Sequence, residues 1–412
     1  MVKLPRYFGE NLRLIAFCTF GMATVFMVFF STRAIQVWPS PWNRASILLA
    51  CLIPVLMVLV SRSRRWLDWQ AFKKHLVLPV IIVLLGILNM VFSEDRAVTI
   101  KVMSLFLISG IGVFVVSESV LTDRRRQNLF LWLCWVCFLV LCVHGVVEYQ
   151  AKKSILLLSY NPIPAGSLLI LLSAAPLLML TSTSKVVRSG AVLSLILGIV
   201  MIAMIGKRGT VLGLFAMVLL SGFALPWKKA LLLVLLALFL FTGGYVMRDQ
   251  LNPQLTKHYF KHHSTLIRAE NYVFARSVWK QKPFFGVGLH VPLAPYLENY
   301  EPKIYKPATK PDYSDYVKKA KTFENIILCG FVEMGSLFSI AYIVLIVIML
   351  KKMFVHVIKN PEKRTRAVLL LMPLFGFFVH SMTFDSIIYP HLNWLAHALL
   401  GLGYNFSLST EI

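Results

Sequence analysis

The sequence predicts an all-α integral membrane protein with about twelve transmembrane helices and one large extracytoplasmic loop. Of its 412 residues, 58% are hydrophobic and only 15% are charged, whereas a soluble domain would carry about 25% charged residues. The one long polar stretch is residues 247–322. These two observations exclude a second, soluble domain of ordinary composition within the chain.

Long apolar runs predict the membrane spans, because a helix needs about 20 residues to cross ~30 Å of hydrocarbon. The second run is short, and the ninth begins almost directly after the eighth. The chain is therefore expected to have three parts, with spans 1–9 in residues 1–246, the loop in 247–322 and spans 10–12 in 323–412. The spans are predicted near residues 12–30, 46–61, 76–92, 98–117, 128–148, 161–181, 189–206, 209–226, 229–246, 324–350, 366–384 and 386–405.

The distribution of lysine and arginine predicts the orientation, since cytoplasmic loops are enriched in both. With a cytoplasmic N-terminus, the short inner segments carry 21 of these residues and the short outer loops carry 7. Both termini are then cytoplasmic and the loop 247–322 is outside, where no ATP is available. An activated donor has to reach that side already attached to a lipid.

The net charge of +24 would suggest nucleic-acid binding in a soluble protein. Here most of the charge flanks apolar runs, so lipid head groups and membrane insertion explain it better, and we expect no nucleic-acid partner. The six cysteines also lie in apolar runs. Cys134 and Cys137 have the spacing of a redox or metal motif, but thiolates need a polar setting, so we expect packing residues and no disulfide.

The loop 247–322 carries thirteen basic and six acidic residues. An anionic ligand accounts for this excess, and a solvated surface facing lipid is the alternative. Within the loop, residues 268–279 have apolar side chains at helical spacing, with Arg268 at the start. The sequence Pro-Phe-Phe-Gly-Val-Gly at 283–288 predicts a turn, and residues 292–313 are expected to be irregular.

Two further positions combine charge with a membrane boundary. Lys207 and Arg208 stand between two apolar runs with almost no loop, which is costly unless they face a polar cavity or lipid head groups; Gly206 and Gly209 beside them favour a bent backbone and close approach of a ligand. Glu324 stands at the start of the tenth span. It is a candidate general base, or else a carboxylate that interacts with a helix dipole.

Several short motifs occur in a characteristic order. These are Lys-Arg-Gly at 207–209, Arg268 in the loop, Pro-Phe-Phe-Gly-Val-Gly at 283–288, Glu-Asn-x-x-Leu at 324–328 and Glu-x-Gly at 333–335. Together with the predicted topology they resemble the O-antigen ligase and polymerase family, which comprises membrane glycosyltransferases acting on glycans linked to undecaprenyl pyrophosphate. The topology covers the whole chain and the motifs cover residues 206–210 and 268–335. The resemblance implies a GT-C-like fold.

The resemblance also implies roles for single residues. Arg208 and Arg268 would bind the donor pyrophosphate, and Glu324 stands where the family usually has the histidine that activates the acceptor. We expect Glu324 to serve as the base; histidines of the loop are the alternative. Substrate-binding roles are expected for Lys207, Arg276, Asn325 and His290. The reaction is expected to invert the anomeric centre, with no metal and no cofactor.

The expected function is therefore a glycan transfer on the periplasmic face of the bacterial inner membrane. As O-antigen ligase, the protein would use lipid A–core as the acceptor; as a polymerase of the same family, it would use another lipid-linked glycan. The cationic loop favours the ligase, because it suits a phosphorylated acceptor. A transporter of lipid-linked oligosaccharides is a third possibility, against which the absence of a clear internal repeat argues.

Overall fold

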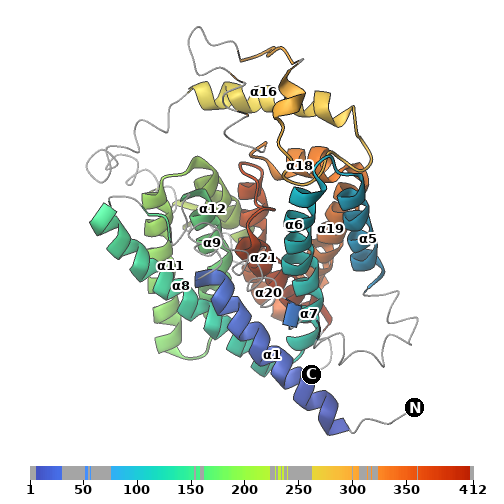
Figure 1. The fold of residues 1–412 in the computed structure, drawn as a ribbon. Helices are drawn as coiled ribbons and strands as arrows, with labels where there is room; N and C mark the ends of the chain where they lie inside the picture. Colours follow the sequence, from blue (N-terminus) through green and yellow to red (C-terminus); the bar gives the residue numbers. More distant parts are fainter. Residues whose placement is uncertain are drawn as a thin grey trace.

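A computed structural model gives the fold shown in Figure 1. It describes residues 6–29, 76–152, 155–157, 162–222, 262–298, 300–305, 323–359 and 361–408, and isolated positions at 52, 53, 56, 228, 231, 232, 234, 235, 239, 313 and 317. No strand occurs among these residues, so the all-helical prediction is confirmed for them. The predicted spans at 46–61 and 229–246 and residues 247–261 fall almost wholly outside the described part.

The regular elements follow the apolar runs of the sequence. The other ten predicted spans all coincide with helices in the described ranges. Polar residues begin several of them: Asp95 caps α6 by accepting from the Val98 amide at 3.1 Å, and Ser184 precedes α11, as the unpaired amides of a first turn require. In chain order the elements are α1 (Arg6–Phe29), α5 (Val77–Phe92), α6 (Arg96–Phe106), the π-helix η1 (Leu107–Gly112), α7 (Val113–Val120), α8 (Arg124–Lys152), α9 (Pro162–Leu172), α10 (Ala174–Met179), α11 (Lys185–Ile205), α12 (Arg208–Ser221), α16 (His262–Trp279), the 3-10 helix η2 (Ala294–Leu297), α18 (Ile326–Cys329), the π-helix η3 (Gly330–Met334), α19 (Ser336–Lys359), α20 (Pro361–Ser381) and α21 (Pro390–Leu408).

Among the described residues, five helical segments are long and apolar enough to cross a membrane: 96–120, 124–151, 162–179, 185–205 and 336–355. Three further apolar helices are shorter, within α1, α5 and α12. The helices α20 and α21 coincide with predicted spans but carry more polar residues, among them His380, His391 and His397, each at most 1% exposed. The helical content agrees with a multi-pass membrane protein, and the total of twelve spans remains a prediction.

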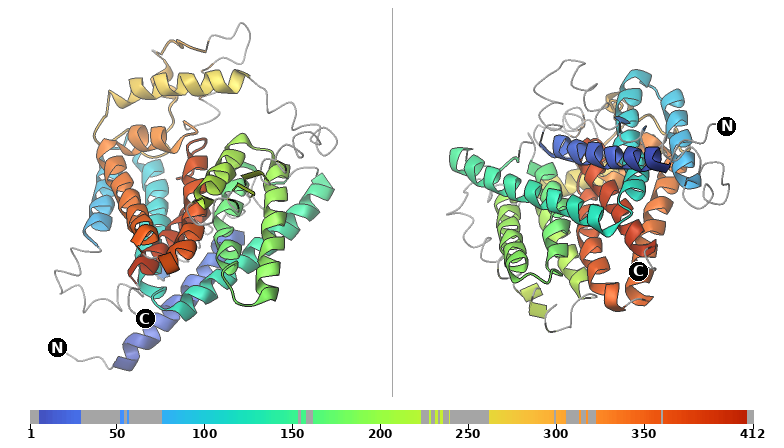
Figure 2. Two further views of the ribbon diagram at one scale, coloured as in Figure 1. Left: turned by 180° about the vertical axis from the view of Figure 1, so that it is seen from behind. Right: turned by 90° about the horizontal axis from the view of Figure 1, so that it is seen from below.

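Helix α20 lies at the centre of the helix bundle. It packs against α12, α19, α9, α10 and α21, and in both views of Figure 2 the red C-terminal helices lie between the green helices and the light-blue ones. Helix α16 crosses one end of the bundle, above α18 (Figure 1). The end of α20 that meets α16 is therefore where segments from distant parts of the chain come together.

The prediction of one continuous helix over 324–350 is wrong at its start. Helix α18 and the π-helix η3 end at Gly335, which has φ of +84°, and α19 starts anew at Ser336. The amides of Ser336 and Leu337 donate to the carbonyls of Pro283 and Phe284 at 2.9 and 3.3 Å. The loop 283–290 thus supplies acceptors for amides at the first turn of α19, which allows a new helix to begin there.

Candidate functional site

The first part of the site is the tight hairpin between α11 and α12. Helix α11 ends at Gly206, whose φ of +66° is left-handed, and α12 begins at Arg208 after a single extended residue, Lys207. Lys207 is half-buried and Arg208 is exposed. The sequence prediction of two cations held in a hairpin with almost no loop is confirmed.

Gly209 brings this hairpin against the end of α20. A Cβ atom at Gly209 would lie 2.0 Å from the Thr383 hydroxyl and 2.9 Å from the His380 ring. The close approach that we expected for a ligand is instead used by packing between helices, as small residues commonly permit in membrane bundles.

Replacing Gly209 with alanine is expected to separate α12 from α20. The added methyl group overlaps Thr383, and overpacking of this kind costs about 1–3 kcal/mol. The Gly209→Ala variant, solubilised in detergent, should therefore unfold at a lower apparent midpoint temperature than wild type. Gly222→Ala at the other end of α12 is the matched control, since among the described residues its Cβ would come no closer than 3.4 Å to another atom. Equal midpoints for the two variants would contradict this packing.

Arg268 reaches the same end of α20 from α16. Its guanidinium Nη2 donates to the carbonyl oxygen of Thr383 at 3.5 Å, while the side chain stays exposed. A helix leaves its last carbonyls without partners inside the helix, and a cation near them is favourable. The end of α20 thus orients Arg268 without covering it.

Glu324 enters from the segment that precedes α18. It is half-buried and has φ of +50°, a left-handed conformation that costs a non-glycine residue about 1–2 kcal/mol. Its neighbours hold it there, because the Asn271 amide group donates to the Phe323 carbonyl at 3.3 Å and Asn325 caps α18. Strained backbone that is fixed from both sides is typical of functional positions.

Lys207 and Glu324 interact across these segments. Partial burial lowers the pKa of the Lys207 ammonium below its ordinary value, and the nearby Glu324 carboxylate acts in the opposite direction. The two groups come from positions 117 residues apart in the sequence. An ammonium beside Glu324 offsets the repulsion between this carboxylate and an anionic ligand.

Asn325 ties the segments together. Its amide nitrogen donates to the Met382 carbonyl at 2.8 Å and to the Tyr272 hydroxyl at 3.1 Å. Its amide oxygen accepts from the Ile327 and Leu328 amides. These four bonds use both donors and both lone pairs of the side chain, so the amide group is engaged within the protein.

The structure therefore brings together most of the predicted site residues. We call this set the junction: Arg268 and Asn325, which bond the Thr383 and Met382 carbonyls, Glu324 beside Lys207, and Arg208, which stands in the hairpin between Lys207 and Gly209. No local pattern marked the two carbonyl groups of Met382 and Thr383, nor Tyr272 and Asn271, since their roles depend on where α20 ends relative to α16.

Two predicted site residues lie elsewhere. Arg276 is exposed on α16, eight residues or about 12 Å along the helix axis from Arg268. The backbone amide of His290 donates to the Glu333 carboxylate at 2.8 Å, nine residues after Glu324. The structure thus leaves both outside the junction.

Glu333 belongs to a second, buried group of side chains. Cys329, Glu333 and Asp385 offer donor atoms that lie within 4.8 Å of one another, and each residue is at most 3% exposed. A metal ion would bridge such a spacing, although buried acids this close also form where they share a proton. The described cysteines are all free, as expected.

One comparison with known proteins covers this region. Residues 193–337 match the model of a family described as O-antigen ligase. A search of curated proteins found no match. The matched region runs from α11 into α19 and contains every residue that the sequence analysis assigned to the site. Together with the apolar helices, this match supports the predicted resemblance to the O-antigen ligase and polymerase family over residues 193–337, about a third of the chain.

Proposed function

We propose that the protein transfers a glycan from undecaprenyl pyrophosphate to a sugar hydroxyl on the periplasmic face of the bacterial inner membrane. The acceptor is lipid A–core, so the protein acts as an O-antigen ligase. One observation supports the proposal: Arg268 donates to the Thr383 carbonyl, and Glu324 lies near the Lys207 ammonium in the hairpin that also carries Arg208. The excess of positive charge in the loop 247–322 favours a phosphorylated acceptor over a second lipid-linked glycan.

The cations of the junction bind the donor. Guanidinium groups form bidentate bonds with phosphate oxygens and remain charged at any physiological pH, so Arg268 and Arg208 hold the pyrophosphate. Lys207 adds a third positive charge. As the bond to the sugar breaks, negative charge builds up on the leaving pyrophosphate, and these fixed cations stabilise it. They supply the charge that a metal ion provides in other enzymes.

Glu324 activates the acceptor. Its carboxylate accepts the proton of the acceptor hydroxyl as that oxygen attacks the anomeric carbon. A new glycosidic C–O bond forms, the bond between the anomeric carbon and the phosphate oxygen breaks, and undecaprenyl pyrophosphate leaves. Attack opposite the leaving group inverts the anomeric centre. Asn325 acts as a positioning residue, because its bonds set the start of α18 next to Glu324.

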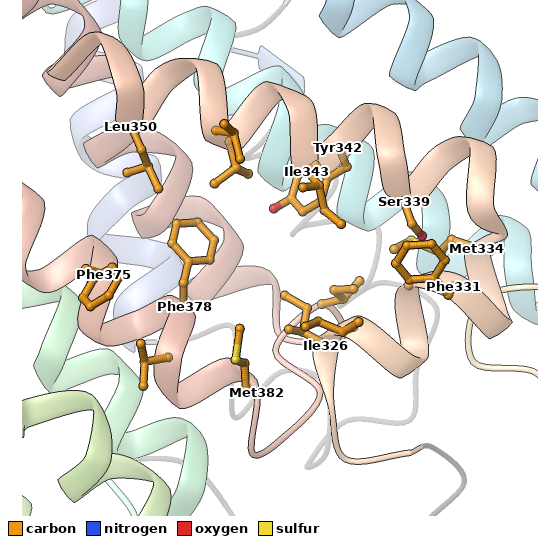
Figure 3. Close-up of a pocket in the computed structure, with 16 residues that line it drawn as sticks. Ile326, Phe331, Met334, Ser339, Tyr342, Ile343, Leu350, Phe375, Phe378 and Met382 are labelled. Carbon is orange, nitrogen blue, oxygen red and sulfur yellow. The ribbon is translucent and has the colours of Figure 1, made fainter. Parts of the chain in front are cut away.

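An apolar groove beside the junction supports a lipid-linked donor. It encloses about 290 Å³ between α18, η3, α19 and α20, and Figure 3 shows the labelled side chains facing a common space. Ile326 and Met382 line it and adjoin Asn325 and Thr383 of the junction. Along α19 the lining runs from Ser339 to Leu350, about 16 Å of helix, or half of a ~30 Å hydrocarbon core. A lipid-linked donor could therefore place its anionic pyrophosphate at the junction and its apolar tail in this groove.

Filling the groove is expected to weaken donor binding without slowing the chemistry. Ile343 is 42% exposed and lines the groove, whereas its neighbour Val344 is 41% exposed and does not. Ile343→Trp should raise the KM for the lipid-linked donor by about tenfold, equivalent to 1.4 kcal/mol, and leave kcat within about twofold. Val344→Trp should behave as wild type. A similar KM for both variants would show that the groove takes no part.

The direct test of the function is a transfer assay with purified protein. It contains an undecaprenyl-pyrophosphate glycan, lipid A–core and a chelator, with no ion gradient. Product formation supports a metal-independent transferase, and its absence in every condition, including added divalent cations, would contradict a transferase and favour a transporter. In cells lacking the gene, core without polymer indicates a ligase, and core carrying a single repeat indicates a polymerase.

A further inference from the structure

We propose that Glu333 is a positioning residue that fixes Glu324 relative to Arg268. This inference rests on the proposed function. It acts through the loop 283–290, which contains the Pro-Phe-Phe-Gly-Val-Gly motif. The mechanism above assigns this loop no role.

The loop 283–290 is bonded to η3 and to the start of α19 along its length. The Val287 and Gly288 amides donate to the Val332 and Glu333 carbonyls at 3.0 and 2.9 Å. A Cβ at Gly286 would lie 2.5 Å from the Glu333 carbonyl oxygen, so this contact requires glycine. A π-helix shifts the hydrogen-bond pattern from i+4 to i+5 and occurs often at functional sites; here carbonyls of η3 face the loop.

Side chains complete the attachment. The Glu333 carboxylate accepts from the His290 amide at 2.8 Å, and the Asn89 amide nitrogen donates to the Phe285 and Glu333 carbonyls at 2.6 and 2.9 Å. His290 has φ of +63°, which costs a non-glycine residue about 1–2 kcal/mol. A conformation of this kind persists only where surrounding contacts over-determine it, and the Glu333 carboxylate provides one such contact.

Glu333 also lies close to the segment that follows α20. One of its carboxylate oxygens lies within 4.8 Å of the Asp385 carboxylate, and Asp385 follows the carbonyls that accept from Arg268 and Asn325. Three segments therefore meet at Glu333: the loop that continues α16, the helix that begins beside Glu324, and the segment that ends α20. Its side chain is fully buried, so it acts by holding the loop 283–290 against η3 and touches no substrate.

This arrangement has a kinetic consequence. Arg268 is carried by α16 and Glu324 by the segment before α18, and a misplacement of about 1 Å between reacting groups costs about a hundredfold in rate. Loss of the Glu333 carboxylate should therefore lower kcat, because Glu324 no longer aligns with the acceptor. The KM for the donor should change little, because the cations that bind pyrophosphate remain.

The test compares Glu333→Leu, which removes the acceptor oxygen, with Glu333→Gln, which keeps one. In the transfer assay, Glu333→Leu should lower kcat by about 10- to 100-fold with donor KM within about twofold, and Glu333→Gln should retain most of the activity. The matched control is Glu94→Gln, whose partly exposed carboxylate pairs with Lys282 at 2.8 Å on the outside of the same loop; exposed ion pairs contribute little, so its kcat should be that of wild type.

The outcomes are distinguishable from those of the proposed function. Wild-type protein without product contradicts the transferase itself. Active wild type with an unchanged kcat in folded Glu333→Leu overturns the positioning role, as does an equal loss in Glu333→Gln. If Glu333→Leu does not fold, Asn89→Leu removes a second bond to the same loop, and a folded variant with wild-type kcat overturns the proposal equally.

Discussion

Replacing Arg268 with alanine is expected to lower kcat/KM for glycan transfer by about a hundred- to a thousandfold, as for removal of one preorganised donor from a charge-stabilising site. Arg268 is exposed, and the Thr383 carbonyl holds its guanidinium beside the hairpin that carries Lys207 and Arg208. Its charge is thus available to a ligand, and alanine leaves the leaving pyrophosphate less stabilised in the transition state.

Two comparisons make this prediction specific. Arg268→Lys should recover only part of the activity, because an ammonium is a point charge that cannot form the bidentate pair. Lys280→Ala removes an exposed cation just beyond the other end of α16 and should stay within about twofold of wild type. Wild-type turnover in Arg268→Ala, or an equal loss in Lys280→Ala, would show that the loop acts only through its overall charge.

Replacing Glu324 with glutamine is expected to lower kcat by about 10²- to 10⁴-fold, the usual contribution of a general base. The amide cannot accept the acceptor proton at neutral pH. The same change removes an anion beside Lys207, so the donor should bind as tightly as before or more tightly. A lower kcat with an unchanged or lower donor KM, measured in folded protein, is therefore the expected pattern.

Glu324→His offers a second comparison, since histidine usually occupies this position in the family that the chain resembles. Histidine can accept a proton near neutral pH, so this variant should be more active than Glu324→Gln. Glu301→Gln is the control: it alters an exposed acid of the loop 247–322, and its kcat should equal that of wild type. Full activity in Glu324→Gln would assign the base elsewhere and leave Glu324 as the partner of Lys207 alone.

Sequence reasoning located the helices well, because apolar runs and caps are local properties. It also identified the cations of the hairpin and the turn at 283–288. It missed the break before α19, since the residues from 326 to 350 are apolar enough for one helix and the break depends on bonds from a loop about 50 residues earlier. For the same reason it placed Glu324 within a helix, whereas Asn325 caps α18 and leaves Glu324 outside.

In the site, too, candidate residues could be predicted from the sequence, whereas contacts between distant segments could not. Residue types marked Arg208, Arg268 and Glu324 as candidates, but the sequence held no sign that the end of α20 would gather them. His290 was a reasonable ligand by type, yet the structure ties its backbone amide to Glu333. Roles that depend on backbone groups of a distant helix end, such as those of Met382 and Thr383, cannot be read from a motif.

A structure of the protein with an undecaprenyl-pyrophosphate lipid bound tests the central claim most directly. The account predicts pyrophosphate oxygens in contact with the Arg268 guanidinium and with Arg208 or Lys207, the proximal tail between α19 and α20, and the Glu324 carboxylate facing the anomeric carbon from the side opposite the leaving group. Pyrophosphate bound away from the end of α20, or Glu324 turned away from the sugar, would contradict it.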